Sequence, residues 1–331
     1  MKSVLMLFVL ANTLYGIQSW DLEVELNSSY TDILNLNWYG DYGTIRRSSN
    51  LERVHFINSE IESVSKYFTN LLEKCVSLKF TNGTVKKVFI DSKLWLLTLN
   101  NTSTENVVIE PGQDYKLRAL IISKSKLTKV PENINQLKHI NRIDIVDNLI
   151  EHITLNDFDG LNNLYEIDLS RNRIKHVDTN GLIRFRELYN LKFSNNQLQQ
   201  LDTCGWDMPS LYMLHVDHNN LTHFAVNHLR ALIDISLRSN PLNCAWVQNL
   251  ANSIGKRSPL TIFYMLFRGD ITCEKESLDD TEMHCPTSIE HQRQQNFGLN
   301  NRLHTFESML KTLESQIIEH QKVVNNVMKE L

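Results

Sequence analysis

Two aspartates and three histidines are the side chains whose types and spacing raise the question of catalysis or metal binding. Asp144 and Asp168 occupy equivalent positions of two similar segments, so stacked segments would bring the two carboxylates together for acid–base work. They are expected on an open surface without a pocket, which favours solvated carboxylates over a catalytic pair. His215, His218 and His223 could hold a metal, but their spacing matches no zinc motif.

Sequence motifs of enzymes are absent as well. The chain contains no H-E-x-x-H, no G-x-S-x-G and no Gly-rich phosphate-binding loop. Its formal net charge of -4 gives no indication of binding to nucleic acid or to an anionic membrane surface. We therefore expect a non-enzymatic protein with no catalytic residue, no bound metal and no cofactor.

A leucine-rich pattern, which recurs about nine times between Leu51 and Asn243, builds the elements that position these side chains. The clearest copy runs from Leu164 to Ile174, with Asn172 at the Asn position, and reads L-x-x-L-x-L-x-x-N-x-L, the signature of leucine-rich repeats. In a looser copy, Ser125 takes the Asn position as a shorter stand-in. The repeats begin at residues 51, 75, 94, 117, 140, 164, 188, 211 and 232, mostly 23 or 24 residues apart.

Each repeat supplies one short strand with its leucines turned inward, and a single unit cannot bury that face alone. The units therefore stack into an α/β solenoid, a leucine-rich-repeat horseshoe of about nine repeats. The Asn at the end of each strand is expected to bond to backbone groups of neighbouring turns. No cysteine lies between Trp20 and Asn50, and the alternation of Leu22, Val24 and Leu26 predicts a capping strand there.

The concave face of the solenoid is the expected ligand surface. Tyr165, Tyr189 and Tyr212 occupy the same position in three successive repeats, so they should stack in a column about 5 Å apart. Exposed aromatics among mixed charges are typical of protein-binding surfaces, although an ordinary cross-strand ladder explains the column equally well. The predicted partner-binding set is Tyr165, Tyr189, Tyr212, Asp144, Asp168, Lys192 and His215.

The N-terminus has the features of a secretory signal peptide. Met1-Lys2-Ser3 precedes the apolar run VLMLFVLA, and cleavage is expected after Gly16 or Ser19. No later apolar run approaches the roughly 20 residues that span a bilayer, so we expect a secreted protein. The sequons that agree with secretion are Asn27, Asn82, Asn100, Asn101 and Asn220, and those at 82, 100 and 101 are expected to face the concave side.

The five cysteines include two that cannot pair with each other in this register. Cys75 and Cys204 lie five repeats apart, roughly 24 Å at about 4.8 Å per strand. A disulfide needs Cα atoms within about 7 Å. We interpret both as buried small hydrophobic residues. An odd count leaves at least one cysteine free or paired with another chain.

Hydrophobic residues after Gly298 repeat with the heptad period of a coiled coil. A single amphipathic helix that folds back on the body is the alternative. In the coiled coil, His320 would be a polar residue in the core, where it sets register or partner choice. The predicted core positions are Leu299, Leu303, Phe306, Leu310, Leu313, Ile317, His320, Val324, Val327 and Leu331.

The run Asn240-Pro241-Leu242-Asn243-Cys244-Ala245-Trp246 resembles the start of the C-terminal cap of extracellular leucine-rich-repeat proteins. This resemblance implies a cap disulfide, for which we expect Cys244 with Cys273, or alternatively Cys244 with Cys285. Cys285 lies just before the heptads and is then the candidate for an interchain disulfide. The expected parts are a signal peptide 1–19, an N-terminal cap 20–50, repeats 51–243, a C-terminal cap 244–286, and a linker with coiled-coil helix 287–331.

Together these parts resemble the mosquito leucine-rich-repeat immune proteins of the LRIM/APL group. The family typically has two adjacent cysteines where this chain has His284-Cys285, and the heptad segment here is short. The resemblance implies secretion into haemolymph, a homo- or heterodimer with another leucine-rich-repeat coiled-coil protein, and binding to complement-like thioester proteins in innate immunity. The alternative is a secreted adhesion or matrix protein of the same fold.

Overall fold

The computed structural model describes residues 5–8, 21–26, 31–38, 51–255, 273–274 and 285. The chain divides into two compact units, residues 1–284 and 285–331, and every element named below belongs to the first. The heptad positions from 299 to 331, the sequon at Asn27 and the proposed cleavage site lie outside the described residues.

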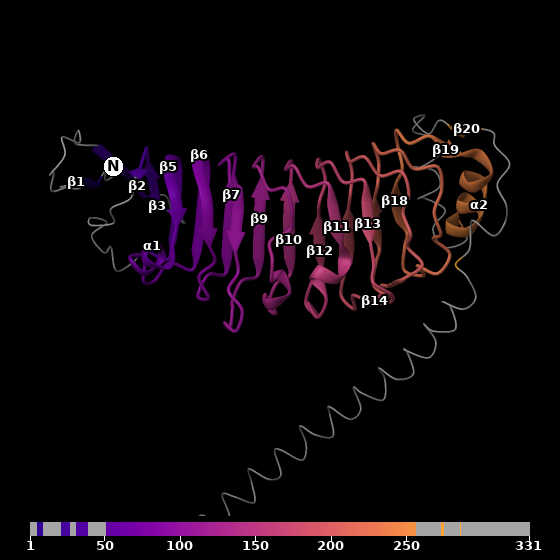
Figure 1. Cartoon of the computed structure of the whole chain (residues 1–331), viewed down its shortest axis with the longest axis horizontal. Coiled ribbons are helices and arrows are strands. Elements are labelled where there is room, and N and C mark those ends of the chain that lie inside the picture. Colours follow the sequence, from indigo (N-terminus) through magenta and orange to yellow (C-terminus); the bar gives the residue numbers. More distant parts are fainter. Residues whose placement is uncertain are drawn as a thin grey trace, which may run out of the picture. The chain divides into compact units, whose positions relative to one another are not determined.

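One parallel strand per repeat forms a continuous sheet (Figure 1). The register is strict: Arg142 pairs with Glu166, Glu166 with Asn190, and Asn190 with Met213. The predicted solenoid is therefore confirmed, with a strand in each of the expected repeats. These strands are β5 (Arg53–Val64), β6 (Ser77–Phe89), β7 (Leu96–Asn100), β9 (Ala119–Ser123), β10 (Arg142–Val146), β12 (Glu166–Asp168), β15 (Asn190–Lys192), β17 (Met213–His215) and β18 (Asp234–Ser236).

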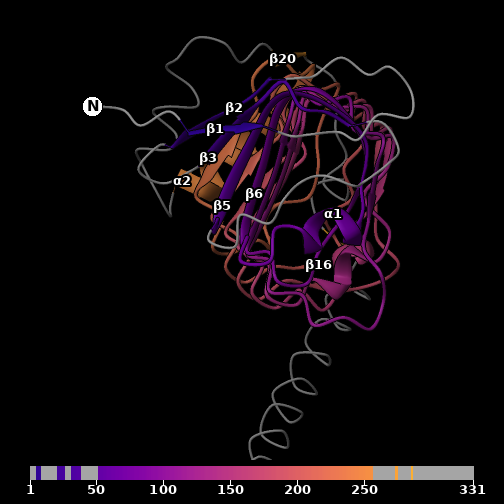
Figure 2. The same cartoon turned by 90° about the vertical axis from the view of Figure 1, so that its left-hand side faces the viewer.

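The N-terminal end of the sheet starts one coil earlier than the repeat pattern. β3 (Thr31–Leu34) is parallel to β5, as is the short β4 (Asn37–Trp38). β2 (Asp21–Leu26) is antiparallel to β3 and is the predicted capping strand. β1 (Leu5–Phe8) pairs with β2 and falls within the expected signal peptide, so cleavage would leave β2 at the edge. Figure 2 looks along the row of strands from this end.

Short elements complete each coil on the other side. β8 (Asn106–Val108) pairs with β6, β11 (His152–Thr154) with β13 (His176–Asp178), and β14 (Ile183–Arg184) with β16 (Trp206–Asp207). The remaining short pieces are α1 (Lys66–Asn70), η1 (Ile134–Gln136) and η2 (Leu155–Phe158). After the last repeat come β19 (Leu242–Asn243), α2 (Cys244–Gly255) and β20 (Cys273–Glu274).

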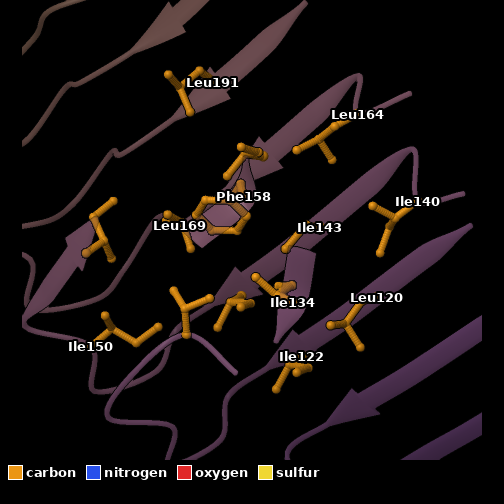
Figure 3. Packing of buried hydrophobic residues seen from close by; sticks show 14 of the residues in the cluster. Leu120, Ile122, Ile134, Ile140, Ile143, Ile150, Phe158, Leu164, Leu169 and Leu191 are labelled. Carbon is orange, nitrogen blue, oxygen red and sulfur yellow. The ribbon is translucent and has the colours of Figure 1, made fainter. Parts of the chain in front are cut away.

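The core consists of the inward leucine and isoleucine positions of every repeat (Figure 3). Leu120, Ile143 and Leu191 are each 0% exposed, as the repeat frame requires. Phe158 and Trp206 close the opposite side and are also buried. Burial of apolar area at about 25 cal/mol per Å² is the main stabilising term for such a stack.

Asparagines at the end of the strands tie successive coils together. The Nδ2 of Asn172 donates to the carbonyl oxygens of Ile145 at 2.7 Å and Leu169 at 3.0 Å, and its Oδ1 accepts from the Ile150 N–H at 3.2 Å. The first four repeats have Ser59, Gly83, Thr102 and Ser125 at this position instead. There, the Thr102 hydroxyl bonds to those of Thr104 at 2.9 Å and Ser125 at 3.3 Å.

The residue before this position has a positive φ in every repeat, including Asn82 (φ 60) and Asn101 (φ 55). From the third repeat on, the strand ends before this left-handed residue, whereas β5 and β6 continue through Asn58 and Asn82. Asn82 and Asn101 are exposed, and Asn101 Nδ2 donates to Asn82 Oδ1 at 2.9 Å. Asn82 lies within β6 and Asn101 directly follows β7, and the concave orientation of these sequons stays a prediction. Asn100 remains in β7 and accepts from the Ser123 hydroxyl at 3.1 Å.

The cysteines agree only in part with the sequence predictions. Cys244 and Cys273 form the expected cap disulfide, with Cα atoms 5.0 Å apart. Cys75 is the free, buried thiol, and burial raises its pKa to about 11. Cys204 and Cys285 are each disulfide-bonded. The interpretation of Cys204 as a thiol is therefore wrong, and so is that of Cys285 as the cysteine open to another chain, because residue spacing does not show which distant segments meet.

Candidate protein-binding surface

The three predicted tyrosines form a stack at the edge where the chain enters the sheet. Tyr165, Tyr189 and Tyr212 directly precede β12, β15 and β17. The ring centroids of Tyr165 and Tyr189 are 5.1 Å apart, and those of Tyr189 and Tyr212 are 4.9 Å apart, with 5° between the planes in both pairs. The predicted column is confirmed, although it borders the concave face instead of lying in its middle.

Stacking decides which parts of the tyrosines a ligand can reach. Both faces of the Tyr189 ring are turned toward a neighbouring ring, so a ligand cannot stack on them. The ring edges and hydroxyl groups remain available, and Tyr165 is 49% exposed. Partial desolvation and the neighbouring groups raise the pKa of Tyr189, which keeps its hydroxyl neutral. The stack therefore suits packing and hydrogen bonding with a protein more than the cage geometry that binds cations.

Charged side chains on the concave face pair with one another. The Arg142 guanidinium contacts Asp144 at 2.7 Å and Glu166 at 3.5 Å. Lys192 contacts Glu166 at 2.7 Å and Asp168 at 3.8 Å. Arg142 and Lys192 thus form ion pairs with three carboxylates on β10 and β12, so each of these charged groups in the middle of the face already has a partner.

Asp144 is buried in this network, so the expectation of a solvated carboxylate is wrong. Burial raises its pKa in spite of the opposing effect of Arg142. The long Arg142 side chain from the same strand folds over the carboxylate, and the repeat pattern cannot show this. Asp168 fits the expectation better, since its carboxylate is close to Lys192 but is not buried.

The histidines are separated by the fold. His215 lies on β17 with its Nε2 4.0 Å from the Asp234 carboxylate. His218 occupies a left-handed turn, and the His223 ring bonds to the Thr222 hydroxyl at 2.8 Å. Within the described ranges, no three side chains of metal-binding type come together.

Two groups that the sequence analysis missed lie on the same side of the sheet. Trp95 is 59% exposed and follows the first leucine position of its repeat, which is the position of the stacked tyrosines. His55 lies on β5, where its Nδ1 is 2.9 Å from Asp32 Oδ1 and its Nε2 is 2.8 Å from Thr81 Oγ1. Both residues occupy regular positions of the weaker N-terminal repeats, so an alignment of those repeats with the later ones predicts that they lie on this side of the sheet.

Comparisons with known proteins agree with this fold. The family model described as Leucine rich repeat matches residues 116–174 and 162–221. No curated protein sequence matches the chain. In the part of the chain that the structure describes, no helix has the length and apolar character needed to cross a membrane.

Several solved structures resemble the chain at low sequence identity. The LRIM1 leucine-rich repeat domain has a TM-score of 0.53 at 14% identity, covering 80% of this chain and 93% of that one. The LRIM1/APL1C complex has a TM-score of 0.54 at 14% identity, covering 86% of this chain and 65%, just under two thirds, of that one. The TLR13-ssRNA13 complex has a TM-score of 0.50 at 15% identity, covering 63% and 32%. These likenesses show a leucine-rich-repeat fold.

Proposed function

We propose that this chain is a secreted, non-catalytic, protein-binding leucine-rich-repeat protein of insect innate immunity. Its partners are another leucine-rich-repeat coiled-coil protein, in a homo- or heterodimer, and a complement-like thioester protein that it stabilises or recruits in haemolymph. The proposal includes the five-part division of the chain set out above and N-glycosylation at the five sequons Asn27, Asn82, Asn100, Asn101 and Asn220.

The observation that carries the binding role is the tyrosine stack. Tyr165, Tyr189 and Tyr212 are held rigidly by a regular sheet and still offer ring edges and hydroxyls to solvent. Aromatic anchors of this kind lose little conformational entropy on binding and dominate many protein interfaces.

Assembly with a related chain is supported by two independent points. The heptads after Gly298 provide an association element in the sequence. The solved LRIM1/APL1C complex, whose fold this chain resembles, joins two differently named proteins. Extension of that assembly to this chain, and of the thioester partner to this solenoid, belongs to the proposal.

Partner capture from haemolymph tests the binding role. Immobilised wild-type protein is compared with the triple variant Tyr165→Ala, Tyr189→Ala and Tyr212→Ala, and captured proteins are identified by mass spectrometry. We expect the triple variant to weaken capture by about 2–4 kcal/mol, or about 30- to 1000-fold, because anchors of an interface are removed.

The control is Tyr67→Ala, which removes a 52% exposed tyrosine from α1, away from the stack. It should bind like wild type, and thermal melts should show that all variants are folded. Equal capture by wild type and the triple variant would contradict the role of the stack. Capture of matrix or cell-surface proteins in place of thioester proteins would support the adhesion alternative.

A further inference from the structure

The tyrosine stack is one part of a longer row. We call the residues that follow the first leucine position of repeats three to eight the strand-start row. Their backbones form one hydrogen-bonded ladder, with N–H to carbonyl distances of 2.8 Å from Arg118 to Trp95, 2.8 Å from Asn141 to Arg118 and 2.8 Å from Tyr165 to Asn141. The row consists of Trp95, Arg118, Asn141, Tyr165, Tyr189 and Tyr212.

This ladder fixes the spacing of the side chains. At about 4.8 Å per parallel strand, the row extends roughly 24 Å from Trp95 to Tyr212, and roughly 14 Å from Trp95 to Tyr165. Trp, Tyr and Arg are the residue types most enriched among the energetic centres of protein interfaces. Here they form a line whose backbone spacing is fixed by the hydrogen-bonded ladder, and such preorganisation lowers the entropic cost of association.

The middle of the row is positively charged. Arg118 is exposed, and its guanidinium donates a long hydrogen bond of 3.4 Å to the His139 carbonyl oxygen. Lys138 is also exposed, with its Nζ at the neighbouring coil, 3.0 Å from where a Cβ on Gly160 would stand, and it makes no ion pair with the described residues. Lys116 pairs with Asp114 at 2.5 Å, and His139 Nε2 lies 3.6 Å from the same carboxylate. Arg118 and Lys116 against Asp114 leave a surplus of one positive charge here, and Lys138 adds a second one toward the next coil.

This charge distinguishes the row from the concave face beside it. On that face, Arg142 and Lys192 are already paired with three carboxylates. A partner that used the concave charges would first have to break those pairs. A partner with carboxylates can reach Arg118 and Lys138 without such a cost, so charge complementarity selects an acidic partner on the row.

We propose that the strand-start row docks an acidic segment of the partner protein. Carboxylates of that segment pair with Arg118 and Lys138, while apolar side chains on either side cover Trp95 and the exposed edge of Tyr165. This inference rests on the proposed function and specifies the chemistry of the partner. A single-stranded nucleic acid is a weaker match, because Tyr189 has no free ring face and Tyr165 and Tyr212 have at most one each, whereas such ligands require successive bases to stack.

Site-specific photocrosslinking tests the chemistry directly. The full-length chain carries a photoreactive phenylalanine at position 95, and after irradiation in haemolymph the crosslinked peptides are sequenced by mass spectrometry. The control carries the same group at position 126, which is exposed and follows the left-handed Lys124 turn at the opposite edge of the sheet. Crosslinks from position 95 should fall on segments with several Asp or Glu residues, and position 126 should not give them.

Charge reversal provides the second arm. The double variant Arg118→Glu and Lys138→Glu should weaken capture of that partner by about tenfold or more, and the loss should shrink at high salt. Lys126→Glu, which makes one matched reversal at the opposite edge, should capture like wild type. Trp95→Ala should also weaken capture, whereas neutral or basic crosslinked segments, or full capture by the double variant, would overturn the inference.

The outcomes separate the two proposals. If wild type captures no protein reproducibly, the proposed function itself fails. If capture depends on the three tyrosines but not on Trp95, Arg118 or Lys138, the binding role stands and the acidic-segment inference fails. If nuclease treatment abolishes capture, the ligand is a nucleic acid and the acidic-segment inference is overturned. A captured protein whose crosslinks do not fall on an acidic segment also contradicts the inference.

Discussion

At the scale of single residues, His55 is one group through which pH acts on the stability of the described solenoid. Its ring lies between Asp32 and Thr81, and the pKa of His55 is lowered from 6.5. Burial is the largest cause and Lys79 adds to it, and together they outweigh the opposing effect of Asp32. The 2.9 Å contact with Asp32 is therefore best understood as a hydrogen bond to a neutral ring, not as an ion pair.

The sign of the pH effect follows from this lowered pKa. Below about pH 6.5 the unfolded chain binds the His55 proton more readily than the folded chain does, so stability falls as pH falls. The unfolding midpoint in urea should decrease more for wild type than for His55→Gln between about pH 7 and about pH 5. His152→Gln, at a histidine whose side chain is 62% exposed, is the control and should behave like wild type. Parallel pH profiles for wild type and His55→Gln would contradict the assignment.

At the scale of elements, Gly83 lets β5 and β6 approach each other where the later repeats have an asparagine. A Cβ at this position would lie 2.2 Å from the Ser59 carbonyl oxygen, and φ is +88. Both the clash and the left-handed backbone oppose a larger residue. The repeat frame places position 83 in the column, but only the coordinates show that the neighbouring backbone fills the space of a side chain.

Gly83→Ala should therefore destabilise the fold by about 3 kcal/mol or more. Gly112→Ala separates the two causes, because Gly112 has φ +77 with no atom within 4 Å of the added Cβ. That control should lose only about 1–2 kcal/mol, the cost of the left-handed conformation. Chemical denaturation of both variants measures the difference, and equal losses would show that the close approach to Ser59 is not the cause.

At the scale of the whole molecule, the heptad segment is expected to set the oligomeric state. Removal of residues after Gly298 should turn a dimer into a monomer, because Leu303, Phe306, Leu310, Leu313 and Ile317 form the predicted seam. Light scattering on full-length and truncated protein measures this. Association should also weaken as pH falls toward about 5, because apposed His320 rings would become charged.

His320→Asn is the matched control for the pH effect, since it keeps a polar residue in the seam without a titrating group. It should dimerise with little dependence on pH. A truncated protein that assembles as well as full-length protein would show that the segment is a packing helix. Since Cys285 is already disulfide-bonded in this structure, reductant should not be required to see the monomer after truncation.

The sequence by itself determined the solenoid, its register and the tyrosine column. These features depend on a period, and in a stack of equal coils the same position in successive repeats must become a neighbour in space. For this reason the 5.1 Å and 4.9 Å spacings of the rings agree with the column expected from residues 165, 189 and 212. The position of Trp95 in the same column could also be predicted, because its repeat keeps the pattern although it matches the leucine consensus less well.

Only the tertiary structure decided the contacts and the burial of individual side chains at the positions of the repeat. The burial of Asp144 depends on the rotamer of Arg142, and the contact of His55 with Asp32 depends on a coil before the first recognisable repeat. The left-handed backbone at Asn82 and Asn101 does not follow from the period, and disulfide bonds remove Cys204 and Cys285 from the free thiols. Rotamers, turns and disulfides arise from contacts between segments, and a one-dimensional repeat contains no information about them.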